Sequence, residues 1–238
     1  GPGEDGLDIV VLITAWNPGR AVVIDSAGDI YAGLTSVYTD SPDGILNIGT
    51  WRVPHDVRGA WMIFSYHNGL VAGWNYIRTQ TGYEMPIATA RWPFETEPHY
   101  HPGGEIHLPN WAAWYPDIIL HEYAHHVMYS LYGYLPPTLS EHHINQTSDA
   151  STAWVEGWAH FFPLAVQNDP DLTDWNLETP HWCSAGWDDG DLVEGRVAGA
   201  LWDIFDSQND SAPWYYDSFS DRFSRIWNIM HTTPCNNF

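Results

Sequence analysis

The apolar and polar positions follow different periods in the two halves of the chain. Residues 9–14 form a short apolar run between turn residues, typical of a buried strand, and residues 21–25 are expected to pair with it in a hairpin. Residues 50–66 alternate aromatic with polar positions, which also favours a strand. Residues 68–81 space their apolar side chains as a helix does, and residues 86–91 are expected to return as a strand. The first half is therefore predicted to be β-rich with one helix.

Beyond residue 115 the apolar positions recur three and four residues apart, which predicts helices. These helices are expected over residues 116–133, 150–166, 191–205 and 217–231. Strands followed by helices are typical of an α+β fold. We therefore expect an N-terminal mixed β-sheet with a helix, followed by a mostly helical C-terminal lobe. The two parts would span residues 1–115 and 116–238.

The charge of the chain excludes two classes of partner. The formal net charge is −22, and all 8 basic residues are Arg. We therefore expect no basic surface that neutralises nucleic-acid phosphates or binds an anionic membrane. No apolar run approaches the ~18–20 residues that cross a bilayer, so no membrane span is expected.

The most informative stretch is His121-Glu122-Tyr-Ala-His125, the pattern HExxH, inside a predicted helix. Residues four apart lie on one face of a helix, so both imidazoles are able to bind one zinc ion. Glu122, beside the first imidazole, then reaches a water on that ion. The pattern predicts a hydrolytic zinc site. The alternative is a pair of histidines that are satisfied inside a partly buried helix.

A catalytic zinc ion needs a third protein ligand from another element. Glu156 is the first choice, because it lies in an otherwise apolar stretch of the helix predicted at residues 150–166, where an unpaired carboxylate is costly. A solvent-facing Glu156 is the alternative. Glu194 ranks second, because with Asp191 it forms a capping pattern at a helix start, which gives it a structural task.

Residues 103–108 form a short extended segment directly before the HExxH helix. We expect this segment to be an edge strand. Such an edge would either bind a peptide by strand addition, with Gly104, Glu105 and Ile106 in contact with it, or be a plain edge strand.

Two further groups of side chains raise the question of another ion. His99, His101 and His107 recur at a spacing compatible with one strand face, where exposed histidines are the simpler expectation and a second metal ion the alternative. The stretch Asp188-Asp-Gly-Asp191 resembles part of a calcium loop but lacks its final Glu. A solvated acidic loop is expected there, with Ca²⁺ as the alternative.

The motifs together resemble a known family. HEYAH followed by EGWAHFF resembles the gluzincin metallopeptidases, the thermolysin-like group, and is most similar to the fungalysin-type pattern HExxH…EGWSDFF. The later stretch EGRVAGALW resembles the downstream helix of that group. The resemblance implies a zincin-like fold and a secreted endopeptidase for peptide or protein substrates. It also implies one zinc ion held by His121, His125 and Glu156, with Glu122 as the general base.

The sequence departs from the family's pattern at two places. The acid that follows the third ligand by four residues, and orients a zinc histidine, is here His160. The orienting partner is therefore sought among His160, Asp149 and Asp203. The histidine that stabilises the transition state in this group has no match either, and Arg196 is the candidate for that positive charge, with an unspecified Tyr as the alternative.

The two cysteines bear on the compartment. Cys183 and Cys235 are expected to form a disulfide in an oxidising environment, and two free thiols are the alternative. Together with the resemblance, this favours a mature, secreted chain.

Three functions stay open at this point. The first is a zinc endopeptidase. The second is an extracellular structural or adhesive module with a vestigial or structural zinc site, whose Trp-rich surface self-assembles. The third is a zinc hydrolase for another bond, with Trp side chains stacked on sugars. Zinc content and peptide hydrolysis discriminate between them.

Overall fold

The computed structural model describes residues 6–41, 44–50, 58–94, 97–101, 103–172, 175–177, 190–207 and 220–234. Its strands are β1 Leu7–Ile9, β2 Leu12–Thr14, β3 Trp16–Asn17, β4 Ala21–Ile24, β5 Ala32–Leu34, β6 Tyr38–Ser41, β7 Ala88–Arg91, β8 His99–His101, β9 Glu105–His107, β10 Asp171–Leu172 and β11 Trp175–Asn176. Its helices are α1 Arg58–Thr81, α2 Pro116–Tyr132, α3 Ala150–Gln167, α4 Glu194–Phe205 and α5 Phe223–Thr232, with 3₁₀ turns η1 Asn110–Trp114 and η2 Gly190–Leu192. The expected α+β order, a sheet region followed by helices, is confirmed.

The main sheet has five strands in the order β3-β4-β7-β9-β8. Strands β4, β7 and β9 run parallel, whereas β3 and β8 pair antiparallel with their neighbours, so the sheet is mixed as predicted. Strand β9 lies between β7 and β8. The prediction that Gly104, Glu105 and Ile106 belong to an edge strand is therefore wrong, and the edge is β8.

The cause of this difference is the turn between β8 and β9. Gly103 and Gly104 have φ angles of 134° and 112°, a region that side-chain-bearing residues rarely adopt. The Gly104 amide also donates to the His101 carbonyl oxygen at 3.1 Å. The two glycines thus reverse the chain, so that residues 99–101 form strand β8, which pairs with the outer side of β9.

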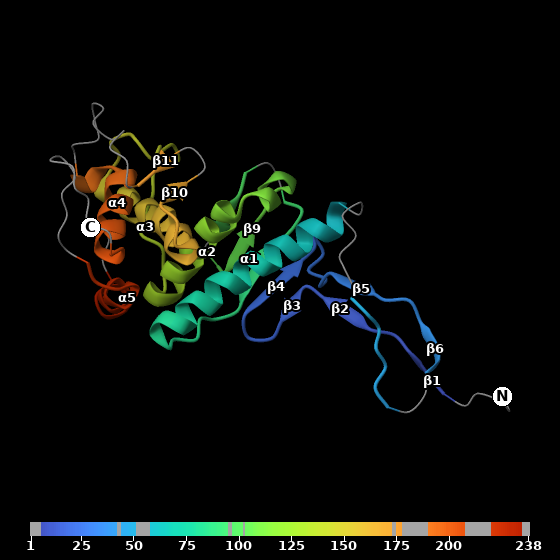
Figure 1. Cartoon of the computed structure of the whole chain (residues 1–238). Coiled ribbons are helices and arrows are strands. Elements are labelled where there is room, and N and C mark those ends of the chain that lie inside the picture. Colours follow the sequence, from blue (N-terminus) through green and yellow to red (C-terminus); the bar gives the residue numbers. More distant parts are fainter. Residues whose placement is uncertain are drawn as a thin grey trace.

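Helix α1 crosses one face of the sheet (Figure 1). It begins at Arg58, so the strand predicted over residues 50–66 is wrong where the structure describes it, and the helix predicted at residues 68–81 is longer than expected. Met62, Tyr66 and Leu70 recur at four-residue spacing and are all buried against the sheet side of the core. The aromatic and polar residues that alternate in this stretch therefore belong to a helix with one buried face.

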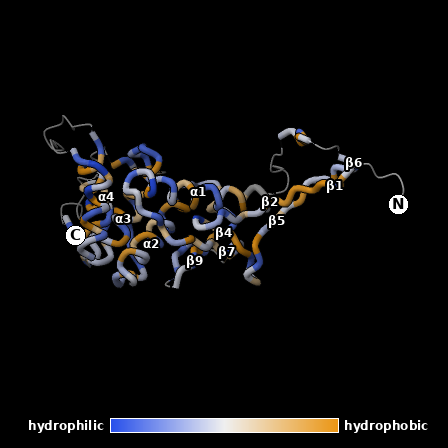
Figure 2. The backbone as a smooth tube through the Cα atoms, turned by 90° about the horizontal axis from the view of Figure 1, so that it is seen from below, coloured by the Kyte–Doolittle hydropathy of each residue, from blue (hydrophilic) through white to orange (hydrophobic). Residues whose placement is uncertain are grey.

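The apolar run at residues 9–14 is not a buried strand. It divides into β1, which pairs with β6, and β2, which pairs with β5, and residues 21–24 pair with β3 instead. These short pairs form an arm that projects from the body, with hydrophobic segments along it (Figures 1 and 2). Leu12 and Leu34 are 59% and 65% exposed there, so no described residue covers this side of the arm.

Close helix packing positions the second half of the chain. Helix α2 lies against α1 and α3, and α3 lies against α4. A Cβ atom on Gly73 would approach the Tyr123 ring to 2.7 Å, and one on Gly157 would approach Val197 Cβ to 2.6 Å. The missing side chains thus allow α1 to approach α2 and α3 to approach α4. The predicted helices at 116–133 and 150–166 are confirmed, while α4 and α5 begin a few residues later than expected.

None of the described helices combines the length and the hydropathy needed to cross a membrane. This holds even for α3, whose described positions are mostly buried.

We expect Gly157→Ala to destabilise the protein by about 1–3 kcal/mol, because the added methyl group has no room between α3 and α4. Its matched control is Gly199→Ala in α4, where a Cβ meets nothing within 4 Å. That change is expected to be neutral or stabilising by up to about 1 kcal/mol, since Ala is the better helix former. Urea unfolding measures both variants, and equal effects would contradict the close packing at Gly157.

Candidate metal centre

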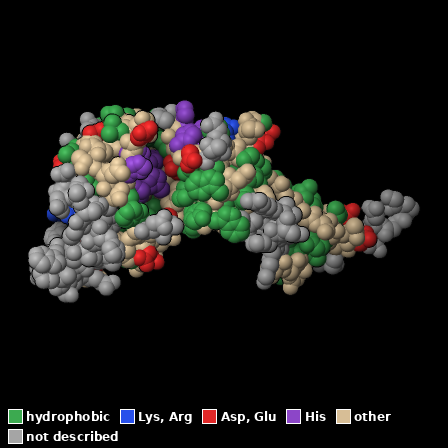
Figure 3. All heavy atoms as spheres, turned by 90° about the horizontal axis from the view of Figure 1, so that it is seen from above, with side chains coloured by type: hydrophobic (Ala, Val, Ile, Leu, Met, Phe, Trp, Pro, Cys, Tyr) green, Lys and Arg blue, Asp and Glu red, His purple; other side chains and the backbone are tan. Residues whose placement is uncertain are grey.

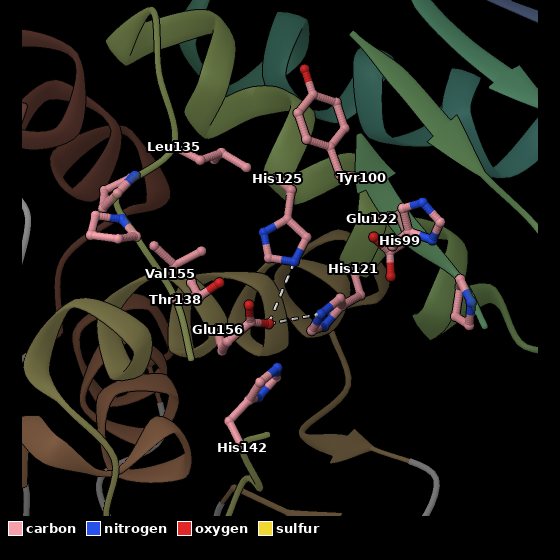
Figure 4. Close-up of a pocket in the computed structure, with 13 residues that line it drawn as sticks. His99, Tyr100, His121, Glu122, His125, Leu135, Thr138, His142, Val155 and Glu156 are labelled. Carbon is pink, nitrogen blue, oxygen red and sulfur yellow. Dashed lines mark ion pairs between the residues drawn. The ribbon is translucent and has the colours of Figure 1, made fainter. Parts of the chain in front are cut away.

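His121 and His125 on α2 and Glu156 on α3 converge on one point (Figure 4). The Nε2 atoms of His121 and His125 lie 3.2 and 3.5 Å from Oε2 of Glu156. One ligand atom from each residue lies within 4.8 Å of the others, and this is the only such group of three among the residues that the structure describes. Two imidazoles and one carboxylate are the donor set of a catalytic zinc site.

The helices that carry these residues are fixed by local sequence. Helix α2 starts with Pro116 at its first turn and ends at Gly133, which has a φ angle of 77°. Helix α3 is capped by Asp149, whose Oδ1 accepts the Thr152 amide at 2.9 Å. The Trp158 Nε1 group donates to the Ala124 carbonyl at 3.0 Å and so ties α3 to α2 beside the histidines.

The N-cap residue of α3 was one of the residues predicted to orient a zinc ligand. Asp149 caps α3. Its second oxygen accepts from the Thr152 hydroxyl at 3.2 Å. Thr152 engages both carboxylate oxygens, and no described contact brings Asp149 to His121 or His125, so its orienting role stays a prediction.

The Glu156 carboxylate is 6% exposed and faces the two imidazoles. Burial alone would raise its pKa, but the neighbouring histidines hold it well below the usual value. Burial likewise opposes charge on His125, but Glu156 prevails and raises the pKa of His125 to about 9. Burial lowers the pKa of His121 to about 4. The carboxylate is therefore anionic and keeps a positive charge beside it.

Glu122 lies next to this group and is 5% exposed. Burial raises its pKa to about 7, while His125 and a hydrogen bond from the Tyr100 backbone amide in β8 act in the other direction. A carboxyl group with a pKa near neutrality both takes and returns a proton readily at physiological pH. Glu122 is thus suited to proton transfer.

The centre opens into a cleft of about 530 Å³. One wall is formed by β8 and the residue before it, and the other by the loop that follows α2. Its lining comprises Pro98, His99, Tyr100, His121, Glu122, His125, Leu135, Pro136, Pro137, Thr138, His142, Val155 and Glu156. A second cavity of about 290 Å³ shares His121 and Glu122 and also contacts His160 and Trp175. The cluster of His121, His125 and Glu156 therefore lies between two open spaces.

A third buried carboxylate lies beside the cleft, and the sequence pattern did not predict its burial. Glu194 is 0% exposed, and its oxygens lie 2.9 Å from Nδ1 of His142 and 3.5 Å from Nε2 of His160. The cap of α4 is Val193, so the capping role predicted for Glu194 is wrong. A signal was present, because Glu194 shares one helical face with Val197.

Both histidine partners of Glu194 approach the cluster of His121, His125 and Glu156. His142 points into the cleft (Figure 4). His160, a candidate orienting residue, places its ring centroid 4.8 Å from that of His121. Glu194 is therefore linked to the centre through two side chains.

The remaining candidates are not brought to the cleft by any described contact. Arg196 and Asp203 lie on α4 and are not among the described residues that line the two cavities. Their catalytic and orienting roles stay predictions. Cys183 and Cys235, and the first two residues of the acidic stretch at 188–191, lie outside the described residues.

In the metal-free protein we expect Glu122→Gln to increase stability at high pH. The folded-state pKa of about 7 exceeds the usual 4.5, so ionisation of Glu122 disfavours the folded form. The gain is absent below pH 4.5 and reaches about 2–4 kcal/mol above the folded pKa. Denaturation with a chelator at pH 4 and pH 8 measures it, and a pH-independent difference would show that Glu122 is not buried as described.

A family model described as the mycolysin C-terminal domain matches residues 72–227, well over half of the chain. No curated protein matches the chain. The matched span contains α2, α3 and α4, and therefore all the residues of the centre described above. The expected relationship to thermolysin-like peptidases is thereby confirmed at the level of the family. The chain belongs to the family of the mycolysin C-terminal domain, among the thermolysin-like peptidases.

Proposed function

We propose that this protein is a secreted, zinc-dependent endopeptidase of the gluzincin type. The observation that carries the proposal is the convergence of His121, His125 and Glu156 beside a buried Glu122 at the base of a cleft. A bound zinc ion would polarise the scissile carbonyl and lower the pKa of the attacking water. A zincin-like division at residue 115/116, with a β-rich part and a helical part on either side of the cleft, belongs to the same proposal.

The residues fit a zinc ion in their chemistry and their burial. A nearly buried carboxylate whose close partners are two imidazoles requires positive charge at that point. Helix α2 presents both imidazole Nε2 atoms to the same oxygen of Glu156, so the three donors need little rearrangement to bind one ion. His121, His125 and Glu156 would hold it.

Glu122 performs the proton transfers in this proposal. Its carboxylate takes a proton from the attacking water and delivers it to the amine nitrogen of the leaving group. Burial supports both steps, because the raised pKa makes the protonated and ionised forms close in free energy near neutral pH. The Tyr100 amide of β8 holds the carboxylate at the cleft wall.

The substrate strand is proposed to lie along β8 instead of β9. Strand β8 is an edge of the main sheet, and Pro98, His99 and Tyr100 line the cleft. An edge strand offers unpaired backbone groups to an extended peptide. This arrangement retains the expected binding by strand addition but moves it one strand outward.

His142 is proposed as the donor to the substrate carbonyl oxygen. Its Nδ1 atom donates to the buried Glu194, which leaves Nε2 as the ring nitrogen that faces the cleft. A histidine that donates from Nδ1 to a carboxylate and from Nε2 to a substrate oxygen carries a positive charge. His142 thus supplies the positive charge for which Arg196 was the sequence-based candidate. Secretion stays a proposal, and so does a disulfide between Cys183 and Cys235, which two cysteines would form in an oxidising compartment.

The exposed apolar arm favours a second candidate, an extracellular assembly module. Leu7, Leu12 and Leu34 are 72%, 59% and 65% exposed. Strand pairs with exposed apolar side chains are prone to associate. Sedimentation that finds large ordered polymers, together with no hydrolysis of any peptide, would favour this candidate over the peptidase.

Zinc analysis and a quenched-peptide assay test the first proposal. The purified wild-type protein should carry about one zinc ion at this centre and cleave peptides. His121→Ala should lose the zinc ion of this centre and the activity, because one of three ligands is removed. Glu122→Gln should keep the zinc and lose activity by about 100-fold or more, because only the proton carrier is changed. An active Glu122→Gln variant would refute the assigned mechanism.

His142→Ala should lower kcat by about 100-fold or more with little change in KM or zinc content, as expected when a donor to developing charge is removed. The matched control is His143→Ala, a neighbouring exposed histidine, which should leave kcat unchanged. If Arg196→Ala lowers kcat and His142→Ala does not, the donor is Arg196 and the role given to His142 is wrong.

A further inference from the structure

A second group of histidines lies on the sheet edge beside the cleft. Strands β8 and β9 pair antiparallel with His99 opposite His107 and His101 opposite Glu105, so all four side chains lie on the same face of the sheet. Figure 3 shows histidine side chains gathered in two neighbouring patches on one face of the molecule. Of this second group only His99 also lines the cleft, and none of its members belongs to the His121, His125 and Glu156 cluster.

Two ring nitrogens in this group face each other closely. The His107 Nδ1 atom lies 3.0 Å from the His99 Nε2 atom. Phe94 packs on the His107 ring, with centroids 3.9 Å apart, and contacts the His99 ring edge-on at 5.7 Å. The two imidazoles are therefore held in place by packing as well as by strand pairing.

The outer nitrogen of each ring has a partner that only accepts. The His99 Nδ1 atom lies 3.4 Å from the Glu97 carbonyl oxygen, and a carbonyl oxygen has no proton to donate. The His107 Nε2 atom lies 3.3 Å from Oε2 of Glu105. Arg91 binds both oxygens of that carboxylate at 2.8 Å and holds the pKa of Glu105 below its usual value. Each outer nitrogen is therefore well placed to carry the ring hydrogen.

It follows that the facing nitrogens, in the neutral rings, both present lone pairs. Two lone pairs at 3.0 Å repel each other unless a cation lies between them. An additional proton, shared by the two rings, is one such cation. A metal ion is the other. Two nitrogen ligands of one tetrahedral zinc ion are about 3.3 Å apart, close to the observed separation.

We propose that His99 and His107 bind a second divalent transition-metal ion, such as Zn²⁺, at the edge of the main sheet. Glu105 and the Glu97 carbonyl orient the two rings from behind, as outer partners commonly do for metal-binding histidines. His101 stacks near His107, with ring centroids 5.6 Å apart, and is the neighbouring candidate for a third ligand after a side-chain rotation. Imidazole ligands favour zinc, copper or nickel over calcium or magnesium.

The ion would fix the edge strand that forms one wall of the cleft. His99 itself lines the cleft, and the next residue, Tyr100, supplies the backbone amide that contacts Glu122. Cross-linking β8 to β9 through metal would hold that amide in place. The predicted role is therefore structural, and it is independent of whether peptide hydrolysis occurs.

Zinc binding by metal-free protein tests this proposal without an activity assay. After chelation, re-addition of zinc chloride and gel filtration, wild type should retain about two zinc ions and His121→Ala about one. His121→Ala/His99→Ala should retain none, whereas His121→Ala/His143→Ala, the matched control, should keep its ion. A His121→Ala variant without zinc, or one that keeps zinc when His99 is also replaced, would overturn the proposal.

Thermal unfolding and cobalt spectra provide a second readout. His99 is exposed, so its replacement should leave the fold intact, which circular dichroism checks. Zinc should raise the Tm of His121→Ala but not that of His121→Ala/His99→Ala. Co²⁺ should give tetrahedral absorption bands in the first variant only. Equal Tm shifts in both variants would contradict the site, while loss of peptidase activity in His121→Ala alone would bear only on the first centre.

Discussion

A carboxylate that is almost excluded from water has to meet positive charge, and this constraint organises the protein around Glu156. Its two nearby partners are the Nε2 atoms of His121 and His125, which one helix presents at a four-residue spacing. The cost of burying a charge without compensation is several kcal/mol. Helices α2 and α3 must therefore keep this register, and the bond from Trp158 to the Ala124 carbonyl holds it.

A buried carboxylate on helix α4 likewise needs positively charged or hydrogen-bonding partners. Glu194 is fully buried on α4, and the histidines that approach it come from the loop after α2 and from α3. Gly157 permits this, because a side chain there would strike Val197 and the Glu194 carbonyl. The two buried acids thus act on one cleft, since Glu156 gathers the proposed zinc ligands while Glu194 directs His142 into it.

Local patterns predicted the centre better than the sheet. The HExxH spacing and the apolar surroundings of Glu156 are properties of single helices, so they are visible in sequence. Which strand lies at a sheet edge depends on how separate strands pair. Nothing within residues 103–108 reveals that β8 pairs with β9 on its outer side. Glu194 satisfied a local capping pattern, yet its burial depends on histidines that are distant in sequence, such as His142. Residues 9–14 were wrongly predicted to be a buried strand, because an apolar composition does not specify whether other residues pack over it.

X-ray absorption at the zinc edge, on protein with a single equivalent of zinc, tests the central claim most directly. The account predicts two imidazole nitrogens at about 2.0–2.1 Å and a carboxylate oxygen at about 2.0–2.2 Å, with the oxygen contribution lost in Glu156→Ala. A zinc spectrum that is the same in wild type and Glu156→Ala, or one with sulfur ligands at about 2.3 Å, would contradict it.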